Sequence, residues 1–263
     1  MFSPITVAAA LIVLTAVAAK PFKLLTTGGV LAAIFVGLTT DFCGGLSAVG
    51  MLVTFFATSN LLGLWRKKHK LSLGFEKGGA RDHWQVLANG GPALVGLLIG
   101  KYLLAGIIFP GAYLALFAAG LAEANADTWA TEIGSVSGQK PRSIITGKLL
   151  EPGQSGGIST IGTIASAIGA AVLGVSFALL IPHHAQIRYV AAIVIAGFCG
   201  ALADSIFGAS IQAQYEVDSG KIIETSSRTS RLVRGFTWIR NDAVNFTAGI
   251  VAIAVAVAAL WRV

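Results

Sequence analysis

Charged residues are scarce in this chain. Lys, Arg, Asp and Glu make up 12% of its 263 residues, whereas they make up about 25% of a typical soluble domain. Cysteine is scarcer still: Cys43 and Cys199 both lie in apolar runs, outside any CxxC or Cys/His cluster. These shortages exclude a disordered chain, an ordinary soluble enzyme and a disulfide-stapled secreted domain, and they argue against a zinc site.

Apolar residues and glycine dominate the composition instead. Hydrophobic residues form 55% of the chain, and 32 residues are glycine. Glycine and alanine allow helices to approach each other closely inside a membrane. The composition therefore predicts an all-α, polytopic membrane helix bundle, with residues 1–263 forming a single integral-membrane domain.

Eight apolar stretches come close to the length of about 20 residues that a helix needs to cross a bilayer. The first has no basic residue before it, which favours a retained span over a cleaved signal peptide. We expect the spans at residues 4–19, 24–40, 43–65, 85–101, 111–133, 158–181, 188–209 and 241–261.

The connections between these spans differ in charge. One set, which includes loops 66–84, 134–157 and 210–240, carries 16 Lys and Arg residues, whereas the opposite set carries 3. The positive-inside rule then places the long basic loops in the cytoplasm and both termini outside. Orientation accounts for most of the net charge of +7, which also suits anionic lipids or a phosphorylated substrate. We expect a plasma or thylakoid membrane protein with no nucleic-acid partner.

Acidic and amide side chains inside spans are costly and commonly functional. They lie near the cytoplasmic ends of three spans: Glu123, Asn125, Asp127 and Glu132 in the fifth, Asp204 in the seventh, and Asn241, Asp242 and Asn245 at the start of the eighth. Oxygen ligands without His or thiolate suit a hard cation such as Mg²⁺. We expect Asp127, Glu132 and Asp204 to bind it. The alternative role for these groups is hydrogen bonding between helices.

The basic loops carry the complementary charge. Lys77 and Arg81 flank two glycines, and Lys140, Arg142 and Lys148 precede the sixth span. Gly156, Gly157, Ser159 and Thr160 then open that span, where backbone N–H groups and a helix N-terminus could bind phosphate. The order of residues is not that of a Walker A motif. A flexible turn whose cations only set the membrane orientation is the alternative for each loop.

Five segments resemble an integral-membrane family long catalogued as a domain of unknown function, which includes the plant and cyanobacterial phytyl-phosphate kinases. They are EKGGARDHWQVLANGG (76–91), ADTWATEIG (126–134), PRSIITGKLLEPGQSGGISTIGTIAS (141–166), ADSIFGASIQ (203–212) and RNDAVNFTAG (240–249). The resemblance runs from about residue 40 to the C-terminus. Two departures from the family pattern are Ser155, where some relatives have Asn, and Asp82, where the pattern has Asn after Arg.

This resemblance implies an activity. A nucleoside triphosphate, with CTP as the expected donor, would phosphorylate a prenyl monophosphate such as phytyl phosphate, with Mg²⁺ as cofactor. The residues of this chain that match the family motifs, and that the resemblance implies for catalysis, are Asp127, Glu132, Asp204, Asn241, Asp242 and Asn245.

Two other classes use similar parts. A cytidylyltransferase that forms CDP-lipids would leave the nucleotide in the lipid product. An ion-coupled transporter of a phosphorylated small molecule would also bury acids, but nearer the middle of the bilayer and between repeated halves. The acids here crowd one interface, and the sequence has no convincing internal repeat, which favours the kinase.

Overall fold

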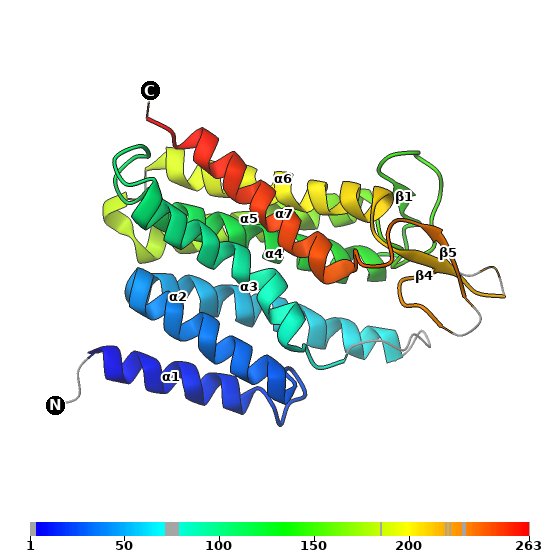
Figure 1. Ribbon diagram of the computed structural model, residues 1–263, viewed down its shortest axis with the longest axis horizontal. Helices are drawn as coiled ribbons and strands as arrows, with labels where there is room; N and C mark the ends of the chain where they lie inside the picture. The colour runs from blue at the N-terminus through cyan, green and yellow to red at the C-terminus, as the bar shows by residue number, and fades with distance from the viewer. Residues whose placement is uncertain are drawn as a thin grey trace.

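The computed structural model describes residues 4–71, 79–184, 186–218, 220, 222–227 and 230–262. These residues form a bundle of long helices with short strands at one end (Figure 1). The α-helices are α1 (Pro4–Ala18), α2 (Thr27–Leu71), α3 (His83–Leu98), α4 (Ala112–Val136), α5 (Thr160–Leu180), α6 (Ile187–Ser210) and α7 (Asn241–Ala259). A π-helical turn, η1 (Ile99–Leu103), extends α3, and a 3-10 turn, η2 (Pro182–His184), follows α5. The predicted class, a membrane helix bundle, is confirmed.

Helix α2 contains the second and third predicted spans, and it turns sharply between them (Figure 1). The turn occurs at Gly45, whose φ of 70° and ψ of −171° are not helical and suit glycine because it has no Cβ. The break frees backbone carbonyl groups of the first arm. Lys101 donates from Nζ to the carbonyl oxygen of Cys43 at 2.6 Å, so a cation stabilises the C-terminal end of that arm. The predicted connection at 41–42 is therefore helical, and the chain reverses a few residues later.

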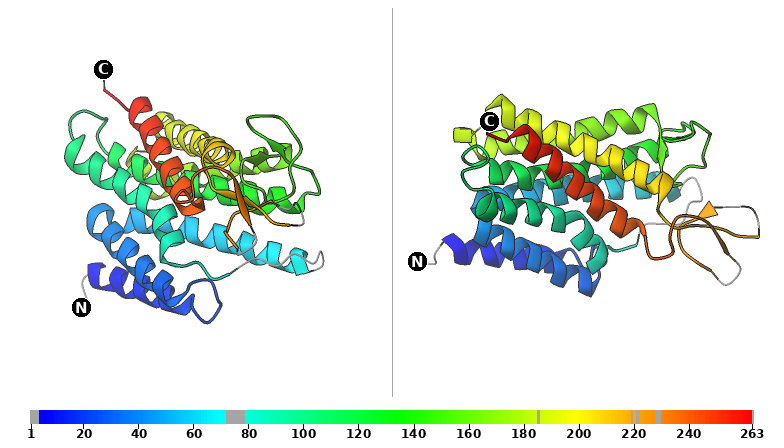
Figure 2. Two further views of the ribbon diagram at one scale, coloured as in Figure 1. Left: turned by 45° about the vertical axis from the view of Figure 1, so that its right-hand side comes forward. Right: turned by 45° about the horizontal axis from the view of Figure 1, so that its top comes forward.

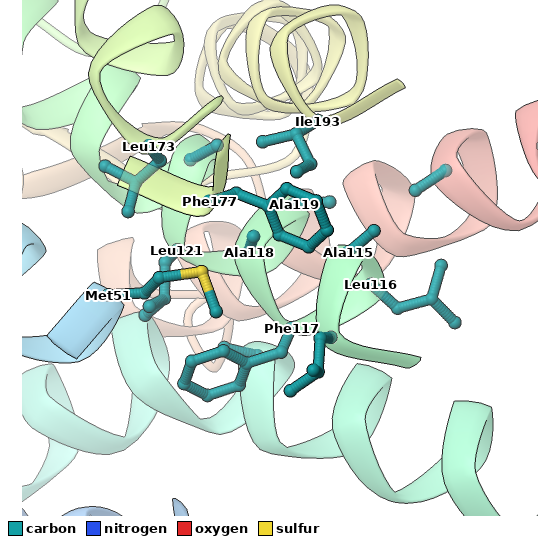
Figure 3. Packing of buried hydrophobic residues seen from close by; sticks show 14 of the residues in the cluster. Met51, Ala115, Leu116, Phe117, Ala118, Ala119, Leu121, Leu173, Phe177 and Ile193 are labelled. Atoms are coloured by element: carbon teal, nitrogen blue, oxygen red, sulfur yellow. The ribbon is translucent and has the colours of Figure 1, made fainter. Parts of the chain in front are cut away.

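Helix α4 lies at the centre of the bundle. It packs against α2, α3, α5, α6 and α7, and every residue from Leu114 to Ala126 is buried. Side chains from three neighbouring helices surround it in Figure 3, including Met51, Phe177 and Ile193. Many of its own core residues are alanine, so the neighbouring helices approach its backbone closely. Polar residues on α4 are thereby held among five other helices.

Short strands outside the helices were not predicted from the sequence. Strands β1 (Arg142–Ser143) and β2 (Gly157–Ile158) pair antiparallel. Strand β3 (Gln214–Glu216) pairs antiparallel with both β4 (Ile222–Ile223) and β5 (Arg231–Arg234). These small sheets give backbone partners to loops 134–157 and 210–240, which the hydropathy pattern shows only as polar connections.

Five helical stretches in the described residues are long and apolar enough to cross a membrane: Thr27–Trp65, His83–Leu103, Thr160–Leu180, Ile187–Ser210 and Asn241–Ala259. The first of them holds both arms of α2. Helix α1 is shorter, and the acidic and amide side chains of α4 lower its hydropathy. The integral-membrane character follows from these helices, whereas the number of eight spans stays a prediction.

The two predicted sets of connections lie at opposite ends of the bundle. Both termini and the turns after η1 and η2 share one end, and all the strands lie at the other (Figures 1 and 2). We call the end with the strands the loop end. Segregation of this kind is what the charge count predicts for a chain that crosses one bilayer repeatedly.

The predicted orientation can be tested by cysteine labelling. After Cys43 and Cys199 are replaced by Ser, Ser226→Cys at the loop end should react in intact cells only with a membrane-permeant maleimide. His183→Cys, at the opposite end, should react with an impermeant one. Both positions are exposed, so access to the reagent is set by the membrane. The reverse pattern would show that the basic loops face outward.

Candidate functional site

Three carboxylates of α4 and α6 interact electrostatically with each other. Glu123 and Asp127 lie one turn apart on α4. Glu123 interacts electrostatically with Asp127 and with Asp204 of α6, and Asp204 also interacts with Asp127. Glu123 is 2% exposed, and its Oε1 has no hydrogen-bond partner in the described structure. We call Glu123, Asp127 and Asp204 the acidic cluster.

A glycine of α6 makes room for Glu123. A Cβ on Gly200 of α6 would lie 2.5 Å from Glu123 Cγ, and a Cβ on Gly249 of α7 would lie 3.4 Å from Glu123 Oε2. A side chain at Gly200 would require Glu123 to move. Gly200 of α6 therefore allows a carboxylate to occupy the tightly packed centre of the bundle, whereas a Cβ on Gly249 would collide with Pro92 instead.

Asn245 links the acidic cluster to two further helices. With its amide oriented so that nitrogen donates, it gives hydrogen bonds of 3.0 Å to Asp204 Oδ2 and to the carbonyl oxygen of Asn241. Its other amide atom lies 3.2 Å from the side chain of Asn89 on α3. This orientation is the one that the surrounding acceptors require. The motif residues Asp204 and Asn245 thus meet. Asn89 lies inside the 76–91 motif but was not among the predicted site residues.

Glu132, five residues after Asp127 on α4, interacts with a cation. It interacts electrostatically with Arg81, just before α3, as well as with Asp127. Burial lowers the pKa of the Arg81 guanidinium, and the charge of Glu132 opposes that shift; an arginine remains charged under such conditions. The backbone of Arg81 is held by hydrogen bonds with Leu24 and Thr26. Arg81, predicted to bind phosphate, therefore lies beside a carboxylate predicted to bind metal.

Asn241 and Asp242 lie in the first turn of α7 but face elsewhere. Asn241 is exposed, and Asp242 interacts electrostatically with Asp82 and Arg240. Asp82 itself caps α3, because Oδ1 accepts from Gln85 N at 3.0 Å in a capping box. The structure therefore brings Asn245, but not these two neighbours, into contact with Asp204.

Asn125, a possible site residue on sequence grounds, forms a structural junction. Its Oδ1 accepts from Thr58 Oγ1 at 2.9 Å and from Ser59 Oγ at 3.2 Å, and its Nδ2 donates to the carbonyl oxygen of Gly169 at 2.8 Å. The side chain is fully buried. Asn125 thus joins α2, α4 and α5, which is the hydrogen-bonding alternative that the sequence left open.

Replacing Asn125 by Ala should reduce stability more than it changes the chemistry of the site. The change removes three hydrogen bonds and leaves the buried hydroxyl of Ser59 without this acceptor, whereas Thr58 keeps its bond to the Thr54 carbonyl oxygen. A buried polar group left unpaired costs about 1–3 kcal/mol. We expect a clearly lower midpoint of thermal unfolding in detergent. Thr128→Ala, which removes a bond to the carbonyl of its own helix at Ala124, is the control and should have a small effect. Equal midpoints for the two variants would contradict the junction.

Side chains from loops 134–157 and 210–240 extend the site beyond the helices. Ser155 donates from Oγ to Glu224 Oε1 and accepts from Gln212 Nε2 at 2.9 Å. Gln214 Nε2 donates to the Ser155 carbonyl oxygen at 3.2 Å. Glu224 interacts electrostatically with both Asp127 and Asp204. Sequence reasoning missed Glu224; only Gln212 and Ser155 fall inside the motifs that the sequence singled out.

The glycine pair of loop 134–157 packs closely against the protein. Gly156 has a φ of +80°, and a Cβ there would lie 2.5 Å from Ala209 Cα. The N–H of Gly157 donates to the Gln154 carbonyl oxygen at 3.2 Å. Gly156 thus allows the loop to touch the end of α6, and phosphate binding by the pair stays a prediction.

The start of α5 already has protein acceptors for part of its backbone. Ser159 Oγ accepts from Gly162 N at 3.1 Å, and Gln139 Oε1 accepts from Ile161 N at 3.2 Å. A phosphate at this helix end would share or replace these acceptors. The end of the helix nevertheless borders an open pocket of about 640 Å³, lined by Gln139, Lys140, Arg142, Ile158, Ser159, Thr160, Thr163 and Ile164.

This pocket gathers four of the residues predicted to bind phosphate: Lys140, Arg142, Ser159 and Thr160. Lys148 is exposed on the same loop but does not line the pocket. Lys77 lies outside the described residues.

The carboxylates of the site can be compared with the ligands that Mg²⁺ takes in proteins. Within the described chain, no Lys or Arg forms an ion pair with the acidic cluster, and no group of three or more His, Cys, Asp or Glu is arranged to hold a metal ion. A site of Asp127, Glu132 and Asp204 is thus not preformed. Mg²⁺ commonly takes one or two protein carboxylates and completes its shell with water and substrate phosphates. Asp127 and Asp204, which interact electrostatically, would supply two such carboxylates.

These features define a class: a helical integral-membrane protein with a buried acidic cluster close to ordered polar loops. Residues 10–253 match the family described as "Integral membrane protein DUF92", and the chain belongs to this family.

Two curated proteins are similar to the chain over most of its length. The chain is 29% identical over 253 aligned residues to Protein PGR of Arabidopsis thaliana, and the match covers 84% of each chain. It is 31% identical over 193 residues to Uncharacterized membrane protein MJ0933 of Methanocaldococcus jannaschii, covering 72% of this chain and 76% of that one. No solved structure matches the chain significantly.

Proposed function

We propose that this protein is a membrane kinase that transfers a phosphoryl group from a nucleoside triphosphate, CTP being the expected donor, to a prenyl monophosphate such as phytyl phosphate. The observation that carries the proposal is the acidic cluster, whose three carboxylates have no Lys or Arg ion-pair partner in the described structure. Carboxylates so close together repel each other unless a cation joins them. Nucleotide-bound Mg²⁺ would be that cation.

The proposed roles follow from position. Asp127 and Asp204 would hold Mg²⁺, and Asn245 orients Asp204 through its hydrogen bond. Lys140 and Arg142 lie in the open pocket at the start of α5, where charge-assisted hydrogen bonds would bind phosphate oxygens. The prenyl tail would lie between the Gly- and Ala-rich helices, so that its phosphate stays at the loop end.

The chemistry asks little of the protein beyond position and charge. A phosphate oxygen of the prenyl monophosphate would form the new bond to the γ-phosphorus, while the bond from that phosphorus to the nucleoside diphosphate breaks. The attacking oxygen is already anionic, so no strong general base is required. Mg²⁺ held by Asp127 and Asp204 would offset the negative charge of the phosphates. The side chains of this protein would hold the two phosphates in line and limit the access of water.

The proposal can be tested directly with purified protein in lipid nanodiscs. The protein would be incubated with Mg²⁺, labelled CTP or ATP, and phytyl, geranylgeranyl or undecaprenyl phosphate, and the lipid product identified by mass. A prenyl diphosphate supports the kinase. A CDP-lipid with release of pyrophosphate would identify a cytidylyltransferase instead, and the absence of any lipid product with all donors would favour the transporter.

The pocket at the start of α5 predicts which cations of its loop contribute to phosphate binding. Lys140→Ala and Arg142→Ala should each raise the apparent KM for nucleotide or lipid phosphate about tenfold, which corresponds to about 1.4 kcal/mol. Lys148→Ala is the matched control, because it removes a cation of the same loop that does not line the pocket. An equal effect of all three variants would show that the loop acts through its net charge.

A further inference from the structure

The pocket at the start of α5 is lined by side chains that suit a phosphate group but not a whole nucleotide. Lys140 and Arg142 supply positive charge, and Ser159, Thr160 and Thr163 supply hydroxyl groups. Among the described residues that line it, there is no carboxylate and no aromatic ring. A nucleotide with its Mg²⁺ would call for carboxylate ligands and for a ring on which its base can stack. The lining therefore favours a ligand whose polar part is a phosphate alone.

The two cations of the pocket are available to a ligand. Within the described structure, neither forms an ion pair with a carboxylate. Strand β1 positions Arg142, because its partner across the sheet is Ile158, which also lines the pocket. Arg142 Nη1 donates to the Gly147 carbonyl oxygen at 3.0 Å, which leaves other N–H groups of the guanidinium for phosphate oxygens. The Arg142 side chain is thus held in place before a ligand binds.

An apolar stripe runs along α5 from the same pocket. Ile161, Ile164, Ile168, Val175 and Leu179 are 37–75% exposed, while the buried residues of the helix pack against α2, α4 and α6. These five lie within about 60° of the helix circumference and extend over about 27 Å along its axis. That length is close to the ~30 Å of the hydrocarbon core of a bilayer. The stripe therefore presents a continuous apolar track to the lipid.

Ile164 connects this stripe with the pocket. It lines the pocket and is 56% exposed, and Ile168 follows one turn later on the same face. A lipid whose chain lay along the stripe would therefore place its headgroup beside Lys140 and Arg142. Side-chain donors would bind that headgroup, because two backbone N–H groups in the first turn of α5 already have side-chain acceptors.

We propose that this pocket binds the phosphate monoester headgroup of a single-chain lipid that arrives from the bilayer, with the hydrocarbon chain along the α5 stripe. A phosphate monoester carries a charge of about −1.5 to −2 near neutral pH and three strong acceptor oxygens, which two cations and three hydroxyl groups complement. A phosphodiester headgroup has a single charge and a second substituent, so it fits less well. The inference deepens the proposed function, on which it rests for the identity of the lipid: the prenyl monophosphate would dock here before its phosphate meets the nucleotide.

Lipid binding in the absence of nucleotide tests this assignment. Native mass spectrometry of detergent-purified protein would follow the binding of geranylgeranyl phosphate to wild type, Lys140→Ala, Arg142→Ala and Lys20→Ala. We expect each pocket variant to raise Kd about tenfold, the loss of one charge-assisted hydrogen bond. Lys20→Ala is the matched control and should bind as wild type does, because it removes an exposed cation of the α1–α2 connection that does not line the pocket. Wild-type binding by both pocket variants would overturn the proposal.

Competing ligands show which chemistry the pocket recognises. Geranylgeranyl phosphate should stay bound in the presence of CTP without Mg²⁺, of inorganic phosphate or of phosphatidylglycerol, and geranylgeraniol should bind much more weakly because it has no phosphate. Displacement by CTP or by inorganic phosphate would show that the chain contributes nothing. Displacement by phosphatidylglycerol would show a general site for anionic lipids. Each of these displacements would overturn the assignment.

The position of the chain can be tested on wild type by photolabelling. Geranylgeranyl phosphate with a diazirine in its chain should label α5 at Ile164 or Ile168 more than α6 at Ile195, and the labelled peptides would be identified by mass. Ile195 is the matched control, because it is also an exposed isoleucine, at 56%. Equal labelling of the two helices would show that the chain does not follow the stripe.

These outcomes separate the docking pocket from the proposed function. Lipid phosphate that binds as expected to a wild type that forms no lipid product would support the pocket and reject the kinase. Pocket variants that bind as wild type does, together with a wild type that forms prenyl diphosphate, would reject the pocket and support the kinase.

Discussion

Replacing Asp204 by Asn should abolish phosphoryl transfer while leaving a folded protein in the membrane. Asn has nearly the same shape as Asp, and its oxygen can still accept the hydrogen bond from Asn245, so α6 and α7 remain joined. The change removes the charge that would bind the cation. We expect at least a hundredfold loss of turnover, or about 2.7 kcal/mol of transition-state stabilisation. Asp127→Asn should behave in the same way, because Asp127 belongs to the same cluster.

The measurement is the rate of lipid product formation at saturating Mg²⁺, with membrane insertion and elution volume as checks on folding. Asp41→Asn is the matched control, because Asp41 is a carboxylate in the last turn before the Gly45 break of α2, beside Cys43, whose carbonyl oxygen accepts from Lys101 of η1. It should retain wild-type turnover. Retention of more than about a tenth of the activity by Asp204→Asn, a loss of less than ~1.4 kcal/mol, would show that Asp204 is not a primary ligand.

Gly156→Ala should strongly destabilise the protein and disorganise the loop end. The residue has a φ of +80°, and a Cβ would lie 2.5 Å from Cα and 2.6 Å from N of Ala209. These are backbone atoms at the end of α6, so they cannot rotate out of the way. Left-handed backbone costs a residue with a Cβ about 1–2 kcal/mol, and overpacking adds about 1–3 kcal/mol. Turnover should fall too, since Ser155 is the adjacent residue and contacts Glu224.

Gly153→Ala provides a close control for this variant. Gly153 lies in the same loop with a φ of +84°, but a Cβ there would have no atom within 4 Å. The two substitutions therefore share the backbone strain and differ in the collision with Ala209. Thermal unfolding in detergent should show a clearly larger loss for Gly156→Ala. Equal losses would mean that the loop does not pack against α6 as the structure shows.

Hydropathy and chain length by themselves determined the class of this protein. The predicted spans 111–133, 158–181 and 188–209 correspond to α4, α5 and α6 within a few residues, because a membrane helix satisfies its backbone locally and needs only enough apolar residues. The motifs also singled out both Asp204 and Asn245, whereas the hydrogen bond between them was found only in the structure. These properties depend on residues that are close together in the sequence or on composition summed over a helix.

The direction in which each polar side chain points was decided only by the tertiary structure. Asn125 and Asp127 are two residues apart on α4, so about 200° of helix rotation separates them. Asn125 consequently bonds to α2 and α5, whereas Asp127 interacts with the groups around Asp204. Glu224, which follows β4, interacts electrostatically with the same cluster, and β4 is held by its pairing with β3. Periodicity shows which residues share a helix face, but the neighbours of that face depend on how the helices cross and where the loops return.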